Sequence, residues 1–146
     1  MSDINIDTSY IEGLQDNQKV AFLRAFLKMA SVDGHFDKSE RDFIMTIAGD
    51  INLSAEGKKQ IFDVLDEDEI LVSLSEIKDR FVAMEIIKEL CLLAHSDNEL
   101  SDEETLFLGK AGLAMGIELE KIEEISDWVI DYIVWKEQGK IIFEEV

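Results

Sequence analysis

Residues 30–40, ASVDGHFDKSE, place three acids around a glycine at spacings that suit a divalent cation. When this glycine is aligned with the glycine of an EF-hand calcium loop, Asp33, Asp37 and Glu40 fall at later ligand positions of that loop. The first two ligand positions hold no acid. The segment therefore resembles half of such a loop, and its chemistry would be coordination of a cation by carboxylate oxygens.

Residues 94–104, AHSDNELSDEE, repeat this pattern 64 residues further along the chain. Asp97 and Glu104 match Asp33 and Glu40, and an asparagine replaces the glycine. Calcium takes 6 to 8 oxygen ligands, so one half loop would bind it weakly and two half loops brought together would bind it better. Oxygen donors of this kind favour Ca, Mg or Mn over Zn.

Both segments also have a structural interpretation, because each would end one helix and begin the next. Glycine and asparagine suit the left-handed turn at a helix end, and Asp37 and Ser101 suit the N-cap of the following helix. Glu40 and Glu104 lie three residues further on, at the acid position of a capping box. Such caps are worth about 1 kcal/mol each, so these acids need no ligand to explain them.

Capping leaves Asp33 and Asp97 unexplained. Each is expected at the C-terminal end of a helix, where the helix dipole disfavours a negative charge by roughly 0.3–1 kcal/mol. A bound cation would compensate for this cost. Asp33 and Asp97 are therefore the two acids that local structure does not explain and that a bound metal would explain.

At these residues the chain resembles the tellurite-resistance TerB family of small helical domains, which also occurs in the DnaJ-like co-chaperone DjlA. The resemblance covers roughly residues 17–135. The family pattern A-x-x-D-G-x-φ-x-x-x-E, where φ is apolar, is present as Ala30, Asp33, Gly34, Phe36 and Glu40, and again as Ala94, Asp97, Asn98, Leu100 and Glu104, with Asn98 in place of the glycine.

This resemblance implies a compact bundle of about seven helices and, in some members, binding of a divalent cation by the motif acids. Carried over to this chain, the implied ligands are Asp33, Glu40, Asp97 and Glu104, with Asp37 as an auxiliary. It also implies a stress-associated or interaction domain, and it does not imply that the chain detoxifies tellurite. Fold alone does not assign a function.

The elements that would position these segments are helices. The chain has no proline and is rich in helix-forming residues, which favours an all-α fold, and at 146 residues it fits one domain, 1–146. Apolar periodicity predicts buried helices over 17–32 and from about 76 to 94, and a further helix over about 38–51. Shorter helices are expected after Ser54 and Asp66, followed by helices over 102–115 and 119–138.

The 64-residue repeat extends beyond the acidic segments into the helices. It predicts two helix-loop-helix units, about 20–53 and 84–117, related by an approximate two-fold axis. Residues 54–80 would form a bridge between them, and the helix over 119–138 a cover ended by Gly139. Asn52 aligns with Gly116, and both residue types suit a helix end. The tail KIIFEEV would either pair as a strand or pack on the domain.

Charge excludes several classes of partner. The net charge of −19 disfavours nucleic acid and anionic membrane surfaces, and it favours divalent cations and basic proteins. The single cysteine, the absence of a secretory signal and the absence of an apolar run of about 20 residues predict a cytoplasmic protein without membrane insertion.

Two other groups of residues have alternative explanations. Cys91 and His95 share a helix face and would form a zinc clip or a nucleophile, but a cysteine in an apolar run more often packs as a small hydrophobe. Trp128, Tyr132 and Trp135 would form an exposed patch for a partner, but Trp128 and Tyr132 share a helix face and such residues more often pack in the core, so Trp135 is the better candidate for an exposed contact. No catalytic or nucleotide-binding motif is present.

The sequence therefore predicts a non-enzymatic, stress-associated TerB-like domain. It would bind a divalent cation through its duplicated acidic segments, with no organic cofactor, and act through an unidentified protein partner. The alternative is a metal-independent acidic protein that binds or inhibits a basic partner. The oligomeric state stays open at this level.

Overall fold

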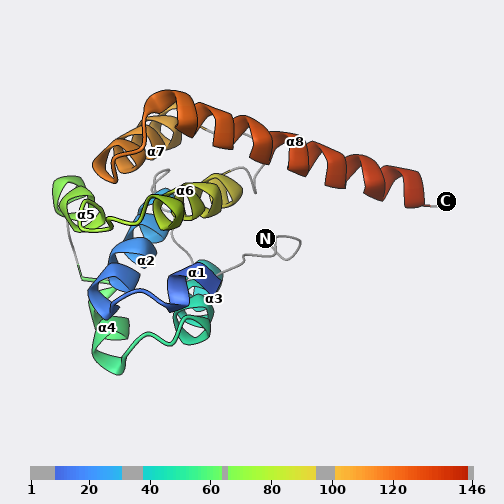
Figure 1. The fold of residues 1–146 in the computed structure, drawn as a ribbon. Helices are drawn as coiled ribbons and strands as arrows, with labels where there is room; N and C mark the ends of the chain where they lie inside the picture. The colour runs from blue at the N-terminus through green and yellow to red at the C-terminus, as the bar shows by residue number, and fades with distance from the viewer. Residues whose placement is uncertain (1–8, 31–37, 64–65, 95–100, 145–146) are drawn as a thin grey trace.

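A computed structural model describes residues 9–30, 38–63, 66–94 and 101–144, and within them the chain forms helices and no strand (Figure 1). The all-α prediction is confirmed, since a single helical turn is followed by seven longer helices in the described residues. The helices are α1 (Ser9–Glu12), α2 (Asp16–Ala30), α3 (Lys38–Asp50), α4 (Ala55–Gln60), α5 (Glu67–Leu74), α6 (Arg80–Ala94), α7 (Asp102–Ala114) and α8 (Leu119–Phe143).

Helices α2 and α6 cross at the centre of the bundle (Figure 1). Helix α2 also packs against α3, α4 and α5, and α6 also packs against α7 and α8. Both central helices are apolar on more than one face, and Phe22, Phe26, Ile86 and Leu90 are fully buried. The prediction of two buried helices is confirmed, because a helix that is covered on several sides must be apolar on several sides.

The 64-residue offset read from the sequence also relates the helix bounds. Helices α6 and α7 begin and end 64 residues after α2 and α3, and α8 begins 64 residues after α4. Each unit packs its second helix on its first, and buried positions match, as in Leu23 with Ile87 and Ile44 with Leu108. The two helix pairs are therefore structurally equivalent.

The two units also end in the same turn. Asn52 and Gly116 are the described residues with left-handed backbones, with φ of 58° and 82°. The next residues, Leu53 and Ile117, each donate their N–H to the carbonyl five residues back, at 3.0 and 2.8 Å, and both side chains are buried. This is a Schellman turn followed by a buried apolar residue, so the prediction that Asn52 and Gly116 terminate helices is confirmed.

The predicted caps of the connecting helices are confirmed as well. The Ser54 hydroxyl oxygen accepts the N–H of Gly57 at 2.9 Å, and Asp66 Oδ1 accepts the N–H of Glu69 at 2.8 Å. The sequence predicts a helix after Ser54 that covers Ile61, Phe62 and Leu65, but α4 is shorter and ends at Gln60. Arg24 explains this end, because its guanidinium donates to the Gln60 carbonyl at 3.1 and 2.6 Å and takes the place of a continued helix.

Helix α6 begins later than predicted, at Arg80 rather than near residue 76. Asp79 sets this start, since its Oδ1 accepts the N–H groups of Phe81 and Val82 at 2.9 and 3.2 Å. Ile77 lies before the helix and is still buried, so it contributes to the apolar pattern without being helical. Apolar periodicity alone therefore overestimated the length of this helix.

Helix α8 departs most from the sequence prediction, because it continues through Gly139 to Phe143 and projects beyond the rest of the bundle (Figure 1). A glycine inside a helix costs only about 1 kcal/mol, which is too little to force an end. The tail forms neither a strand nor a packed segment over its described residues, since Ile141, Ile142 and Phe143 are exposed in the last turn of α8. None of the described helices is both long and apolar enough to cross a membrane.

Candidate functional site

The five predicted cation ligands are only partly within the described structure. Asp33, Asp37 and Asp97 lie outside the described residues. Glu40 lies in the first turn of α3, and its side chain is also outside the described part. Glu104 is thus the predicted ligand whose side-chain contacts are described.

Glu104 forms the capping box predicted for the second acidic segment. The Ser101 hydroxyl oxygen accepts the N–H of Glu104 at 3.0 Å, and Glu104 Oε1 accepts the N–H of Ser101 at 3.1 Å. This reciprocal pair fixes the start of α7 and accounts for Glu104 structurally. Among the described residues, no three His, Cys, Asp or Glu side chains are grouped to hold a metal.

Cys91 has the environment of a core residue. It is fully buried on α6, and burial raises the pKa of its thiol to about 12, although a hydrogen bond with Ser126 acts in the opposite direction. Because the thiolate is the nucleophilic form, the neutral thiol present near pH 7 is unreactive. His95, the other member of the hypothetical zinc clip, lies outside the described residues.

An open groove of about 400 Å³ lies between α6 and α8. Its apolar lining consists of Phe81 and Met84 from α6 and Ile125 and Trp128 from α8. Phe81 and Trp128 are about half exposed, at 48% and 59%. The prediction that Trp128 belongs to the core is wrong, because α6 covers only one side of this part of α8.

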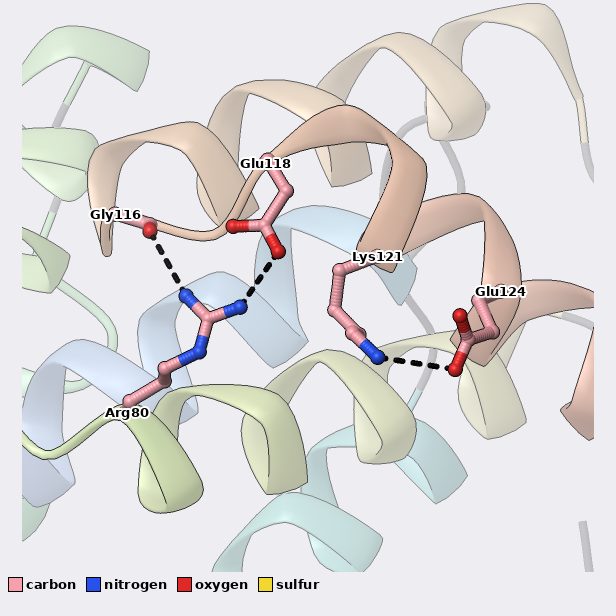
Figure 2. A network of polar contacts seen from close by, with 5 residues as sticks. All are labelled: Arg80, Gly116, Glu118, Lys121 and Glu124. Atoms are coloured by element: carbon pink, nitrogen blue, oxygen red, sulfur yellow. Dashed lines mark hydrogen bonds and ion pairs between the residues drawn. The ribbon is translucent and has the colours of Figure 1, made fainter.

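Ion pairs line both walls of the groove. On the α6 wall, Lys88 Nζ lies 2.6 Å from Glu85 Oε2 and 3.3 Å from Oε1 of the buried Glu89. On the α8 wall, Lys121 Nζ lies 3.0 Å from Glu124 Oε1 (Figure 2). Burial by itself would lower the pKa of Lys88, but the two carboxylates more than offset it and the pKa lies above its ordinary value. Each wall therefore carries a cation already paired with an acid.

Arg80 fixes the start of α8 against the start of α6 (Figure 2). Its Nη2 donates to Glu118 Oε1 at 2.6 Å, and its Nη1 lies 3.4 Å from the carbonyl oxygen of Gly116. The hydrogen bond from Arg80 is the main cause of the lowered pKa of Glu118. Arg80 thus connects α6 to the turn between α7 and α8, at the end of the groove.

The apolar lining of the groove continues along the projecting part of α8. We call this line the α8 seam, and its positions are Ile125, Trp128, Tyr132, Trp135, Gly139 and Ile142. Successive positions are three or four residues apart, the spacing of helices that pair lengthwise. Trp135 is 70% exposed, as the sequence predicts, and a contact through it stays a prediction.

Sequence analysis did not find the groove, and it raised an exposed patch of Trp128, Tyr132 and Trp135 only as an alternative to core packing, although the alternating three- and four-residue spacing can be read from the sequence. The same spacing is typical of a helix face that packs in the core, and that interpretation is wrong for Trp128, whereas Tyr132 is partly buried against the core. The buried residues of α8, Ile122 and Val129, lie on another side of the helix. No protein-family model, curated protein or solved structure that was compared with this chain matches it.

Proposed function

We propose that this chain is a non-enzymatic, TerB-like helical domain of the cytoplasm that binds a divalent cation through its duplicated acidic segments and acts through protein partners. The observation that carries the proposal is the equivalence of the two helix pairs, down to the matching left-handed turns at Asn52 and Gly116. Because the helices on both sides of each acidic segment correspond, the alignment of Asp33 with Asp97 and of Glu40 with Glu104 rests on more than a short motif.

The charge of the chain supports cation binding. A net charge of −19 on 146 residues destabilises the compact state by self-repulsion, and a bound divalent cation would relieve part of it. The proposed ligands are Asp33, Glu40, Asp97 and Glu104, with Asp37 as an auxiliary. Their oxygen donors suit Ca, Mg or Mn.

Calorimetric titration with calcium, magnesium, manganese and zinc tests the metal component. The wild-type chain is compared with Asp33→Asn/Asp97→Asn and with the charge-matched control Asp50→Asn/Asp127→Asn, which changes two exposed acids outside the motifs. We expect binding in the wild type and in the control, and loss of binding in the motif variant. Absence of binding at millimolar metal, or equal binding by all three proteins, contradicts the proposal.

The capping role of Glu104 requires a separate control. Ser101→Ala removes the hydroxyl that accepts the Glu104 N–H and leaves the carboxylate in place. If Glu104 is a ligand, this variant loses stability by about 1 kcal/mol and still binds the cation. If Glu104 only caps α7, Glu104→Ala, which removes the oxygen that accepts the Ser101 N–H, lowers stability without changing metal affinity.

The absence of enzymatic activity is part of the proposal. The nucleophile candidate Cys91 is buried with a pKa of about 12, which supports the interpretation of this residue as structural. The paired carboxylates of the acidic segments suit coordination as well as proton transfer, so they give no independent reason to propose catalysis.

A metal-independent acidic interaction protein is the second candidate. It is favoured by the exposed groove between α6 and α8 together with the charge of −19. A pull-down with and without chelator separates the two candidates. Capture of a basic protein that survives chelator and is released by salt would favour the second candidate, whereas capture lost in chelator would favour the first.

A further inference from the structure

The α8 seam is an apolar line on a helix whose fully buried residues lie elsewhere, and two of its members, Ile125 and Tyr132, are partly buried against the core. Ile122 and Val129 bind α8 to the bundle, and the seam lies about a quarter turn round the helix from them, by the 3.6-residue period. Trp128, Trp135 and Ile142 follow one another at seven-residue intervals and are 59%, 70% and 72% exposed. A second helix laid along this line would cover all three side chains.

We propose that the occupant of the seam is α8 of a second copy of this chain, packed antiparallel. In one register Ile125 faces Ile142 of the second copy, Trp128 faces Gly139, and Tyr132 faces Trp135. The residue numbers of each pair have the same sum, so a single straight alignment of the two helices satisfies all three contacts and, by symmetry, their three counterparts.

Side-chain size supports this register. Trp128 is the first of the three aromatic residues of the seam, and in this register Gly139, which has no side chain, would lie opposite it. A large residue against a small one lets two helices approach closely while filling the space between them. Tyr132 and Trp135 form an aromatic pair at the centre, and Ile125 and Ile142 form an aliphatic pair at each end.

Charge supports the antiparallel direction. The first half of α8, residues 119–131, carries five acids and one lysine, whereas residues 132–144 carry two acids and two lysines. Antiparallel pairing sets the acidic half of one helix against the neutral half of the other. Parallel pairing would set the two acidic halves together, where like charges repel.

The shape of the molecule supports the same direction. The C-terminal half of α8 projects from the bundle, and the bundle sits beside the N-terminal half (Figure 1). In an antiparallel pair the two bundles therefore lie at opposite ends, and the end of each α8 reaches the groove lined by Phe81 and Met84 of the other copy. The paired stretch, residues 125–142, is about 27 Å long.

Association state is measured on the full chain by sedimentation equilibrium and light scattering, with chelator present throughout so that cation binding plays no part. We expect a dimer whose affinity rises with NaCl, because salt screens the repulsion between two chains of charge −19. A basic partner on the same surface would instead be weakened by salt. A chain that stays monomeric at every concentration and salt level overturns the proposal.

Two substitutions of equal charge test the surface. Trp135→Glu places an acid in the seam and is expected to raise the dimer dissociation constant by roughly 30-fold or more. Val134→Glu places the same acid on the neighbouring exposed residue, outside the seam, and is expected to have a much smaller effect. Equal effects of the two variants overturn the assignment. Circular dichroism of both variants shows whether either has lost its fold.

Cysteine cross-linking tests the register. The double variant Ile125→Cys/Ile142→Cys places two cysteine pairs within reach across the antiparallel dimer and is expected to oxidise to a covalent dimer. Each single variant is expected to stay uncross-linked, because its cysteines would lie about 25 Å apart. Cross-linking by the single variants would indicate a parallel pair and overturn the proposal, as would failure of the double variant to cross-link.

Discussion

Arg80 donates a hydrogen bond to Glu118 at 2.6 Å, and at the equivalent positions in the first half of the chain Asp16 accepts one from Ser54. Both members of the second pair lie 64 residues after their counterparts, and Asp16 and Arg80 are the first residues of α2 and α6. In the first pair an acid accepts from a hydroxyl, and in the second a guanidinium donates to an acid. In both halves the first residue of a central helix is therefore hydrogen-bonded to the N-cap residue of a later helix. The acid is on the central helix in the first half and at the N-cap in the second.

The first prediction concerns Asp16, whose pKa is lowered by hydrogen bonds from the Ser54 hydroxyl and backbone N–H. A lowered folded-state pKa contributes stability that is present above the ordinary value of 3.8 and is lost as pH falls through the folded-state value. Urea denaturation of wild type and Asp16→Asn should show a stability difference at pH 7 that closes below about pH 3.8.

The control for this prediction is Asp127→Asn, which removes the same charge from an exposed position of α8 and does not touch Ser54. It separates the effect of losing the hydrogen bonds of ionised Asp16 from the general effect of making the chain less negative by one charge. A difference between wild type and Asp16→Asn that persists unchanged at pH 2.5 would show that the charge of Asp16 contributes nothing.

The second prediction concerns the left-handed turn at Gly116. An alanine there would meet no neighbouring atom, so the cost of Gly116→Ala comes from the backbone alone, with φ of 82°. We expect a loss of about 1–2 kcal/mol in the free energy of unfolding. Gly49→Ala, inside α3 and equally free of contacts, should stabilise by about 0.5–1 kcal/mol. Equal effects would contradict the assigned turn.

The third prediction concerns close packing between α7 and α8. A Cβ at Gly112 would lie within 2.7 Å of Ile122 Cγ1 and 3.4 Å of Ile87 Cδ1, so Gly112→Ala must displace a buried isoleucine. We expect a loss of about 1–3 kcal/mol by thermal or urea denaturation. Gly109→Ala is the matched control one turn earlier, where the nearest atom is 3.7 Å away, and it should be neutral or stabilising.

The fourth prediction concerns the reactivity and alkaline stability of Cys91. Since burial raises its pKa from 9.0 to about 12, the neutral thiol favours the fold, and this stability is present below about pH 9 and lost as pH rises toward 12. At pH 8 a thiol reagent should modify native Cys91 only as fast as the protein opens. Thr105→Cys adds an exposed thiol as a reference, and equal rates at both positions would show that Cys91 is accessible.

Local chemistry made several structural details predictable from the sequence. The caps at Ser54, Asp66 and Ser101 and the turns at Asn52 and Gly116 each depend on hydrogen bonds to residues at most five positions away. The equivalence of the helix pairs followed in the same way, because similar local sequences end and begin helices at similar places. Asp33 and Asp97 remain sequence-based candidates for cation binding.

The sequence alone determined where most helices start and stop, because capping and termination are satisfied within one or two turns of the chain. Only the tertiary structure decided which sides of those helices are covered. The same apolar spacing describes buried Phe22 and exposed Trp128, and it does not distinguish a side that meets α6 from one that meets solvent. Burial is set by neighbours distant in sequence, and for that reason the groove and the seam of α8 became visible only in the folded chain.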